Sequence, residues 1–186
     1  TVESEEISAN AVPGQFVNIK CGDGTQALLR RPISICSTDK KAGTYRLAFQ
    51  KKGIGTGILS CMKAGDTLDI LGPLGNGFDL DSGFKNIAVI GGGIGVFPLL
   101  FLLQESGAVV KRTYLGFQTK HMVMLENEFR SYSSSIDIAT DDGSYGAKGF
   151  PTDILARDLL KESVDMIYAC GPKAMLKKVA EIAKQT

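Results

Sequence analysis

The chain has 186 residues, of which 44% are hydrophobic and 22% charged, and its formal net charge is +1. These values are typical of a globular protein and exclude a disordered or collagen-like chain, and near-neutrality does not favour nucleic acid as a partner. The first ten residues carry three Glu and no apolar run, so they show no secretory signal, and we expect a cytoplasmic protein with reduced thiols.

Glycine is the unusual component of this composition. The chain has 22 glycines, whereas average usage of about 7% predicts about 13 in a chain of this length. Because the sequence is not of low complexity, the excess indicates that the backbone turns sharply, or comes close to another group, in several places.

Up to about residue 84 the sequence predicts a small, mainly antiparallel β domain, either a barrel or a sandwich. Short segments rich in β-branched residues alternate with turn residues, and one short helix follows a glycine-rich loop. The predicted strands are Gln15–Cys21, Tyr45–Gln50 and Thr67–Leu71, and the predicted helix is Thr56–Met62.

From residue 85 onward predicted strands alternate with predicted helices. The strands are Ile87–Ile90, Val109–Leu115, Ile136–Thr140 and Met166–Cys170, and the helices are Phe97–Ser106, Met122–Tyr132, Thr152–Leu160 and Lys173–Lys184. This alternation predicts a parallel sheet with helices on both faces. We place the boundary in Asp81–Lys85, which gives a β domain of residues 1–84 and an α/β domain of residues 85–186.

The segment Asn86–Gln104 has no charged residue and is long enough to span a membrane. Its four glycines and Pro98 stand between β-branched residues and leucines. A buried strand, a turn and a buried helix explain this order better, so we expect no membrane span.

Two glycine-rich turns are candidates for phosphate binding. Gly91–Gly95 lies between the first strand and the first helix of the α/β domain, and Gly53–Gly57 opens the short helix of the β domain, where Thr56 adds a hydroxyl. Backbone N–H groups at a helix N-terminus suit a pyrophosphate, and glycine allows it to come close. Each can also be an ordinary turn, and the first departs from the G-x-G-x-x-G pattern because Val96 occupies its last position.

Two further segments carry candidate binding residues. Arg30–Ser34 lies between predicted strands, where Pro32 fixes an extended backbone and the guanidinium of Arg31 suits a phosphate. Cys170 ends the last strand at the same edge as the Gly91 turn, because parallel strands share their carboxyl edge. No base accompanies this thiol, so nucleophilic catalysis is not favoured, and a small buried residue is the alternative reading.

The remaining polar residues give weaker signals. Asp141 and Asp142 follow a strand at the same edge and either bind a ribose or cap a turn. His121 is the only histidine and lies in a polar loop, so a histidine metal site or a Ser-His-Asp site is not expected. The four cysteines at 21, 36, 61 and 170 form no C-x-x-C pair, so no metal ligand is assigned.

Together these segments resemble the ferredoxin–NADP reductase superfamily, and within it the electron-transfer subunits of NAD-dependent (type B) dihydroorotate dehydrogenases. The resembling stretches, in the family's order, are Leu29–Ile35, Gly72–Phe78, Gly91–Pro98, Thr140–Gly149 and Tyr168–Pro172. The resemblance implies an N-terminal antiparallel β-barrel that binds FAD, followed by a parallel-sheet α/β domain that binds NAD(H).

The resemblance also implies which residues contact each cofactor. Ser34 would lie near the reactive edge of the isoalloxazine, Arg31 near the pyrophosphate, and Cys170 beside the nicotinamide ring, so Ser34 and Cys170 are the candidates closest to the chemistry. The implied flavin site comprises Arg31, Pro32, Ile33, Ser34, Ala48, Phe49, Gln50, Gly55 and Thr56. The implied nicotinamide site comprises Gly92, Gly93, Gly95 and Cys170.

The resemblance implies a partner and an electron path as well. Electrons taken from dihydroorotate by an FMN-containing catalytic subunit would cross a 2Fe-2S cluster to FAD and reduce NAD, in pyrimidine biosynthesis, within a heterotetramer. In that family the cluster ligands follow the last helix, so they are not among these residues. We expect that cluster segment and one barrel strand to be omitted from this sequence.

Two alternatives remain open. The chain can be a flavin reductase subunit of the same superfamily that connects NAD(P)H with ferredoxin or sulfur compounds, or a non-catalytic flavin-binding module. NAD is favoured over NADP because Gly116–Lys120 has no arginine for a 2′-phosphate, although Lys120 could serve.

Overall fold

The computed structural model describes residues 1–22, 27–80 and 83–185 and divides the chain into two compact units. The first unit is Thr1–Phe78 and the second unit is Asp79–Thr186. The predicted boundary segment Asp81–Lys85 begins with two residues that lie outside the described part of the chain.

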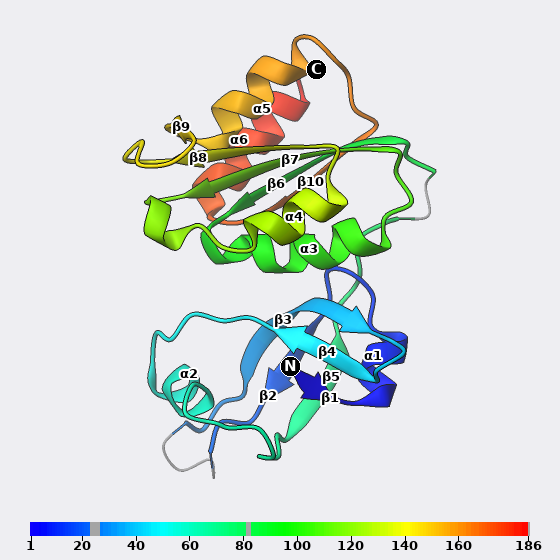
Figure 1. The fold of residues 1–186 in the computed structure, drawn as a ribbon, viewed down its shortest axis with the longest axis vertical. Helices are drawn as coiled ribbons and strands as arrows, with labels where there is room; N and C mark the ends of the chain where they lie inside the picture. Colours follow the sequence, from blue (N-terminus) through cyan, green and yellow to red (C-terminus); the bar gives the residue numbers. More distant parts are fainter. Residues whose placement is uncertain (23–26, 81–82, 186) are drawn as a thin grey trace. The chain divides into compact units, whose positions relative to one another are not determined.

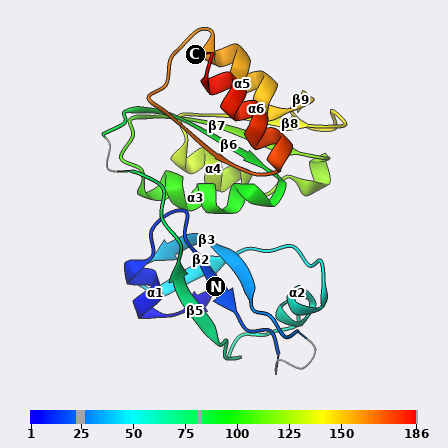
Figure 2. The ribbon, with the colours of Figure 1, turned by 180° about the vertical axis from the view of Figure 1, so that it is seen from behind.

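The first unit is built on an antiparallel sheet of five strands in the order β1-β4-β3-β2-β5 (Figures 1 and 2). Its elements are β1 (Val2–Glu3), α1 (Glu5–Asn10), β2 (Phe16–Ile19), β3 (Arg31–Asp39), β4 (Thr44–Leu47), α2 (Ile54–Leu59) and β5 (Ile70–Leu74). The curled, barrel-like antiparallel architecture expected for this half is confirmed.

The prediction that Arg30–Ser34 lies between strands was wrong. Arg31–Asp39 forms the longest strand of the unit, and its first half pairs with β2. Pro32 stands opposite Asn18 in this ladder. Three positions along the same register, the N–H of Ile35 donates to the carbonyl of Gln15 at 3.1 Å. Hydrogen-bonded and non-hydrogen-bonded pairs alternate, so the nitrogen of Pro32 faces away from β2 and no ladder bond is lost.

The second unit has a parallel sheet of five strands in the order β10-β6-β7-β8-β9, which confirms the predicted α/β architecture. Helices α3 and α4 cover one face and α5 and α6 the other (Figures 1 and 2). The elements are β6 (Asn86–Gly92), η1 (Gly93–Gly95), α3 (Val96–Glu105), β7 (Val110–Phe117), η2 (Lys120–Met122), α4 (Glu126–Tyr132), β8 (Ser135–Thr140), β9 (Ala147–Lys148), α5 (Pro151–Leu159), β10 (Met166–Cys170) and α6 (Lys173–Ala183).

Strand β6 lies between β10 and β7 and is buried on both faces, which explains its continuous apolar sequence. Ala88 and Ile90 pack in the cluster formed with α5 and α6. The alternate residues Ile87 and Val89 therefore face α3. The apolar segment once considered as a membrane span is thus a core strand and a ten-residue helix, and no described helix is long and apolar enough to cross a membrane.

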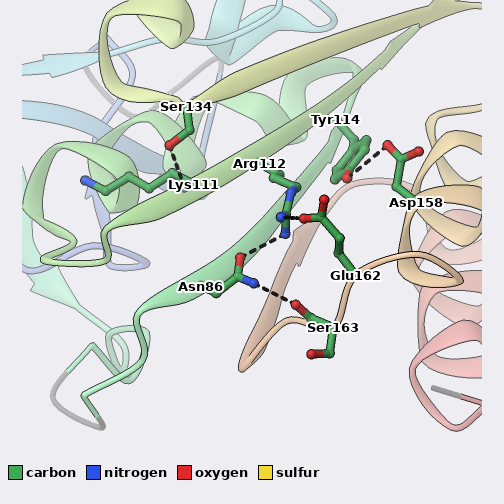
Figure 3. A network of polar contacts seen from close by, with 8 residues as sticks. All are labelled: Asn86, Lys111, Arg112, Tyr114, Ser134, Asp158, Glu162 and Ser163. Atoms are coloured by element: carbon green, nitrogen blue, oxygen red, sulfur yellow. Dashed lines mark hydrogen bonds and ion pairs between the residues drawn. The ribbon is translucent and has the colours of Figure 1, made fainter.

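A polar network ties the amino ends of these strands together (Figure 3). Arg112 donates to the side-chain oxygen of Asn86 at 2.9 Å and pairs with Glu162, and Asn86 donates to the carbonyl of Ser163 at 2.6 Å. The carboxylate of Asp165 accepts from the backbone N–H groups of residues 85 and 86. These contacts fix the amino edge of the sheet and leave its carboxyl edge to the Gly91–Gly95 turn.

We expect Lys111→Met to lower the free energy of unfolding by about 1–2 kcal/mol. The Lys111 ammonium donates to the carbonyls of Leu103 and Ser106 at 3.0 and 2.6 Å, so it caps the C-terminus of α3, and burial lowers its pKa. Urea unfolding measures the change. Lys161→Met in the exposed turn after α5 serves as the control, and equal midpoints for the two variants would contradict the capping role.

Candidate functional site

The carboxyl edge of the second unit contains a topological switch point between β6 and β10. The chain leaves β6 toward β7 on one side, and it later returns through α5 to place β10 on the other side. Ligands of open α/β sheets bind at this kind of position, outside the carboxyl ends of the strands. The predicted site segments Gly91–Gly95 and Cys170–Pro172 meet here, since Cys170 pairs with Gly91 in the parallel ladder.

The glycines of this turn differ in what surrounds their Cβ positions. A Cβ on Gly92 would lie 2.9 Å from both Pro172 and Met175, and a Cβ on Gly95 would lie 2.5 Å from the carbonyl oxygen of Cys170. This chain's own atoms therefore fill the space beside both residues. Gly93 has a φ of +55°, and no atom of the described residues lies within 4 Å of its Cβ position. Of these three predicted contacts, Gly93 is the one with open space for a pyrophosphate.

Cys170 is half-buried at the end of β10, and burial raises the pKa of its thiol. The thiol is therefore protonated at neutral pH, and it offers a small, uncharged and weakly polar surface at the switch point. This fits the predicted place beside a flat ring and not the role of a nucleophile.

At pH 7.5 iodoacetamide is expected to alkylate the exposed Cys61 well before Cys170. The thiolate is the reacting species, and the raised pKa of Cys170 leaves little thiolate until the pH rises further. Mass spectrometry of peptides after a short exposure measures both rates, with the buried Cys21 and Cys36 as slow references. Equal labelling of Cys61 and Cys170 at this pH would contradict a protonated, half-buried Cys170.

The loops after β7 and β8 lie at the same edge of the sheet. Asp142 accepts from the backbone N–H and the hydroxyl of Ser144 at 2.9 and 2.6 Å, so it acts as a turn cap, one of the two roles foreseen for it. Asp141 is exposed, and its carboxylate is available to a ribose. His121 is exposed in η2.

In the first unit, the predicted flavin residues Arg31–Ser34 occupy a part of β3 that pairs on one side. β2 pairs with this part, whereas the ladder with β4 begins only at Ile35 and Leu47. Because the N–H of Ile35 donates toward β2, the N–H of Ser34 points to the opposite edge, from which β4 departs. This edge offers backbone groups to a flat, polar ligand.

The predicted residues Ala48–Gln50 follow β4 outside the sheet, so the predicted strand Tyr45–Gln50 ends earlier, at Leu47. Ala48 and Phe49 are half-buried and Gln50 is exposed. They begin where the β3–β4 ladder ends, which places them beside the edge that Ser34 faces.

Arg31 and the second glycine turn, which the sequence suggested separately, are in contact. A Cβ on Gly55 would lie 2.8 Å from Nε of Arg31 and 3.3 Å from Sγ of Cys21, so only glycine leaves this room for the guanidinium. Nη1 of Arg31 donates to the carbonyl of Leu29 at 2.8 Å. The remaining guanidinium N–H groups can serve a phosphate.

The hydroxyl of Thr56 shapes the loop itself. It accepts from the backbone N–H groups of Lys52 and Gly53 at 2.9 and 3.1 Å. Thr56 thus closes the turn through which the chain enters α2, and a direct contact with a ligand stays a prediction.

The donor sets decide which cofactors these residues fit. The Arg31–Gly55 contact and the edge at Ser34 suit a flavin nucleotide, and the open space at Gly93 suits a dinucleotide. An iron–sulfur cluster does not fit, because the described residues contain no group of three or more His, Cys, Asp or Glu side chains able to hold a metal.

The comparisons agree with this architecture. The chain is similar to the solved structure of an NADH-dependent reduced ferredoxin-NADP oxidoreductase, with a TM-score of 0.85 and 31% identity over 98% of this chain and 65% of the other. Fold and site therefore define an electron-transferring oxidoreductase of the ferredoxin–NADP reductase type.

Sequence relatives narrow the class. The dihydroorotate dehydrogenase B (NAD(+)) electron transfer subunit of Geobacillus sp. (strain WCH70) is 45% identical over 182 residues, which cover 96% of this chain and 68% of the relative. That of Desulforamulus reducens is 40% identical over 180 residues, 96% of this chain and 69% of the relative. The chain belongs to the family of dihydroorotate dehydrogenase B electron transfer subunits. It spans about two thirds of their length, and no protein-family model matches it.

Proposed function

We propose that this chain is the FAD- and NAD-binding part of the electron transfer subunit of a dihydroorotate dehydrogenase. FAD would bind to the β domain of residues 1–84 and NAD to the α/β domain of residues 85–186. The observation that carries the proposal is the β6–β10 switch point, where the open Gly93 turn and Cys170 come together in a chain 45% identical to such a subunit.

Each proposed site residue has a physical role. Arg31 would hold the FAD pyrophosphate, with Gly55 leaving room for the guanidinium. The backbone N–H of Ser34 would orient the flavin ring from the edge of β3. At the other site, Gly93 would let a pyrophosphate approach, and the neutral Cys170 would pack beside the nicotinamide and help to exclude water.

When bound, a flavin supplies two-electron exchange with NADH and electron transfer to other carriers. The protein then has to provide orientation, close approach and exclusion of water, and hydride transfer needs no general acid or base. A site made of backbone N–H groups, a guanidinium and an uncharged thiol meets these requirements.

The partner follows from the family. Electron transfer subunits act with a catalytic subunit, and we propose an FMN-containing dihydroorotate dehydrogenase in a heterotetramer, in the cytoplasm, as part of pyrimidine biosynthesis. A 2Fe-2S cluster between the two flavins would need ligands beyond the residues described, so no step is assigned to it.

Reconstitution with the partner tests this function. The full-length subunit, co-purified with its catalytic subunit and loaded with cofactors, is expected to form NADH when dihydroorotate is added. Formation of orotate without NADH, with an intact complex, would contradict the proposal.

A second candidate is a reductase that exchanges electrons between NAD(P)H and ferredoxin. The 31% identity to an NADH-dependent reduced ferredoxin-NADP oxidoreductase favours it. Reduction of ferredoxin by the same preparation, without any response to dihydroorotate, would select this alternative.

A further inference from the structure

A polar cluster outside the residues assigned so far lies at the carboxyl ends of β7 and β8. We call Lys120, Glu126, Arg130 and Tyr145 the edge cluster. It joins the loop before α4, the first turns of α4 and the loop between β8 and β9, which lie at the same end of the sheet in Figures 1 and 2.

The position of the edge cluster matches the far end of the dinucleotide, if NAD binds as proposed above. The pyrophosphate would lie at Gly93 after β6, and the nicotinamide would extend toward Cys170 on β10. The adenosine half then extends over β7 and β8, which are one and two strands away, at about 5 Å per strand. In doubly wound sheets the ribose 2′ position is read near the end of the second strand, which is β7 here.

The contacts of the edge cluster run from one cation, through a tyrosine and a carboxylate, to a second cation. The ammonium of Lys120 lies 5.7 Å from the centroid of the Tyr145 ring, within the range of a cation–π interaction. The Tyr145 hydroxyl donates to both carboxylate oxygens of Glu126, at 3.0 and 2.9 Å. Nε and Nη2 of Arg130 donate to the same carboxylate at 3.0 and 2.7 Å.

Lys120 is also held through its backbone. Its N–H donates to the hydroxyl of Ser144 at 2.8 Å, which fixes the loop before α4 against the loop that carries Tyr145. The hydrogen bonds from Arg130 and Tyr145 keep the pKa of Glu126 below its usual value, so Glu126 is ionised at neutral pH.

We propose that Glu126 makes this edge selective for NAD over NADP by engaging Arg130, a cation that a 2′-phosphate would need. Arg130 is bound to Glu126 directly. Lys120 lies over the ring of Tyr145, and the hydroxyl of Tyr145 donates to Glu126. A 2′-phosphate brought to this edge would also meet the carboxylate itself, whereas a free 2′-hydroxyl adds no charge. Glu126 is thus a positioning residue for specificity.

The test compares flavin reduction by NADH and by NADPH in the FAD-loaded chain. Wild type is expected to prefer NADH. In Glu126→Gln the ratio of kcat/KM for NADPH to that for NADH is expected to rise roughly tenfold, through a lower KM for NADPH, because the released Arg130 can form a charge-assisted hydrogen bond to the phosphate. Damage to the fold lowers both rates and cannot produce this gain.

Two further variants complete the test. Glu126→Gln combined with Arg130→Met is expected to lose most of the gain, and Glu181→Gln on the exposed face of α6 is the matched charge control. Equal use of NADH and NADPH by wild type, or an unchanged ratio in Glu126→Gln, would overturn the inference. Failure of NADH to reduce the wild-type flavin would instead contradict the proposed function.

Discussion

Gly95→Ala is expected to lower the stability of the second unit by about 3 kcal/mol, the upper part of the range for overpacked sites. The added Cβ would lie 2.5 Å from the carbonyl oxygen of Cys170 and 2.7 Å from Cα of Gly171. Both are backbone atoms where β10 ends, so neither can move like the tip of a side chain. Relief would require β10 to shift away from the turn, and Cys170 would move with it.

Calorimetry measures this effect, because the two units of the chain can unfold in separate transitions. Gly107→Ala is the matched control, since no atom in the described part of the chain lies within 4 Å of its Cβ position and its φ is not positive. We expect the control to unfold like wild type. A Gly95→Ala protein as stable as the control would contradict the close packing of the turn against β10.

Arg31→Ala is expected to weaken FAD binding roughly 10- to 100-fold, which corresponds to about 1.5–3 kcal/mol for hydrogen bonds to a charged group. Arg31 is the cation that the Gly55 turn accommodates. Titration of the flavin-free protein with FAD, followed by flavin fluorescence, measures the dissociation constant.

The neighbouring Arg30→Ala is the control for this experiment. Arg30 pairs with the carboxylate of Asp69 at 2.8 Å and also donates to the backbone carbonyl of Asp69 at 3.0 Å, so its guanidinium is already engaged within the β domain. Its replacement should leave FAD affinity unchanged within about threefold, because its guanidinium is already bound to Asp69. If both variants bind FAD equally well, Arg31 does not contact the cofactor.

Much of the second unit could be predicted from the sequence because its signals are local. A parallel sheet places the ends of its strands at one edge, so the proximity of Cys170 and the Gly91 turn follows from strand order alone, and the register confirms it. The number of glycines indicated close approach. What they approach depends on packing: Gly92 and Gly95 meet β10 and α6, and only Gly93 is left open among the three.

Other features have no local signal. In the sequence Arg31 and Pro32 look like a loop. A strand tolerates proline only where the proline nitrogen faces away from the hydrogen-bonded ladder, and the strand register alone decides this. The contact between Lys120 and Tyr145 joins two loops that are separated by a whole helix and strand. The sequence suggested the segments of both residues as ligand sites, but it gave no sign that the side chains of Lys120 and Tyr145 are in contact.

Anaerobic titration of the FAD-loaded chain with NADH tests the central claim most directly. The proposed function predicts that the flavin absorbance bleaches completely as NADH is added, and that NAD is formed in equal amount. A protein that binds FAD stoichiometrically but keeps its oxidised flavin spectrum in excess NADH would contradict the account, and would identify the chain as a non-catalytic flavin-binding module.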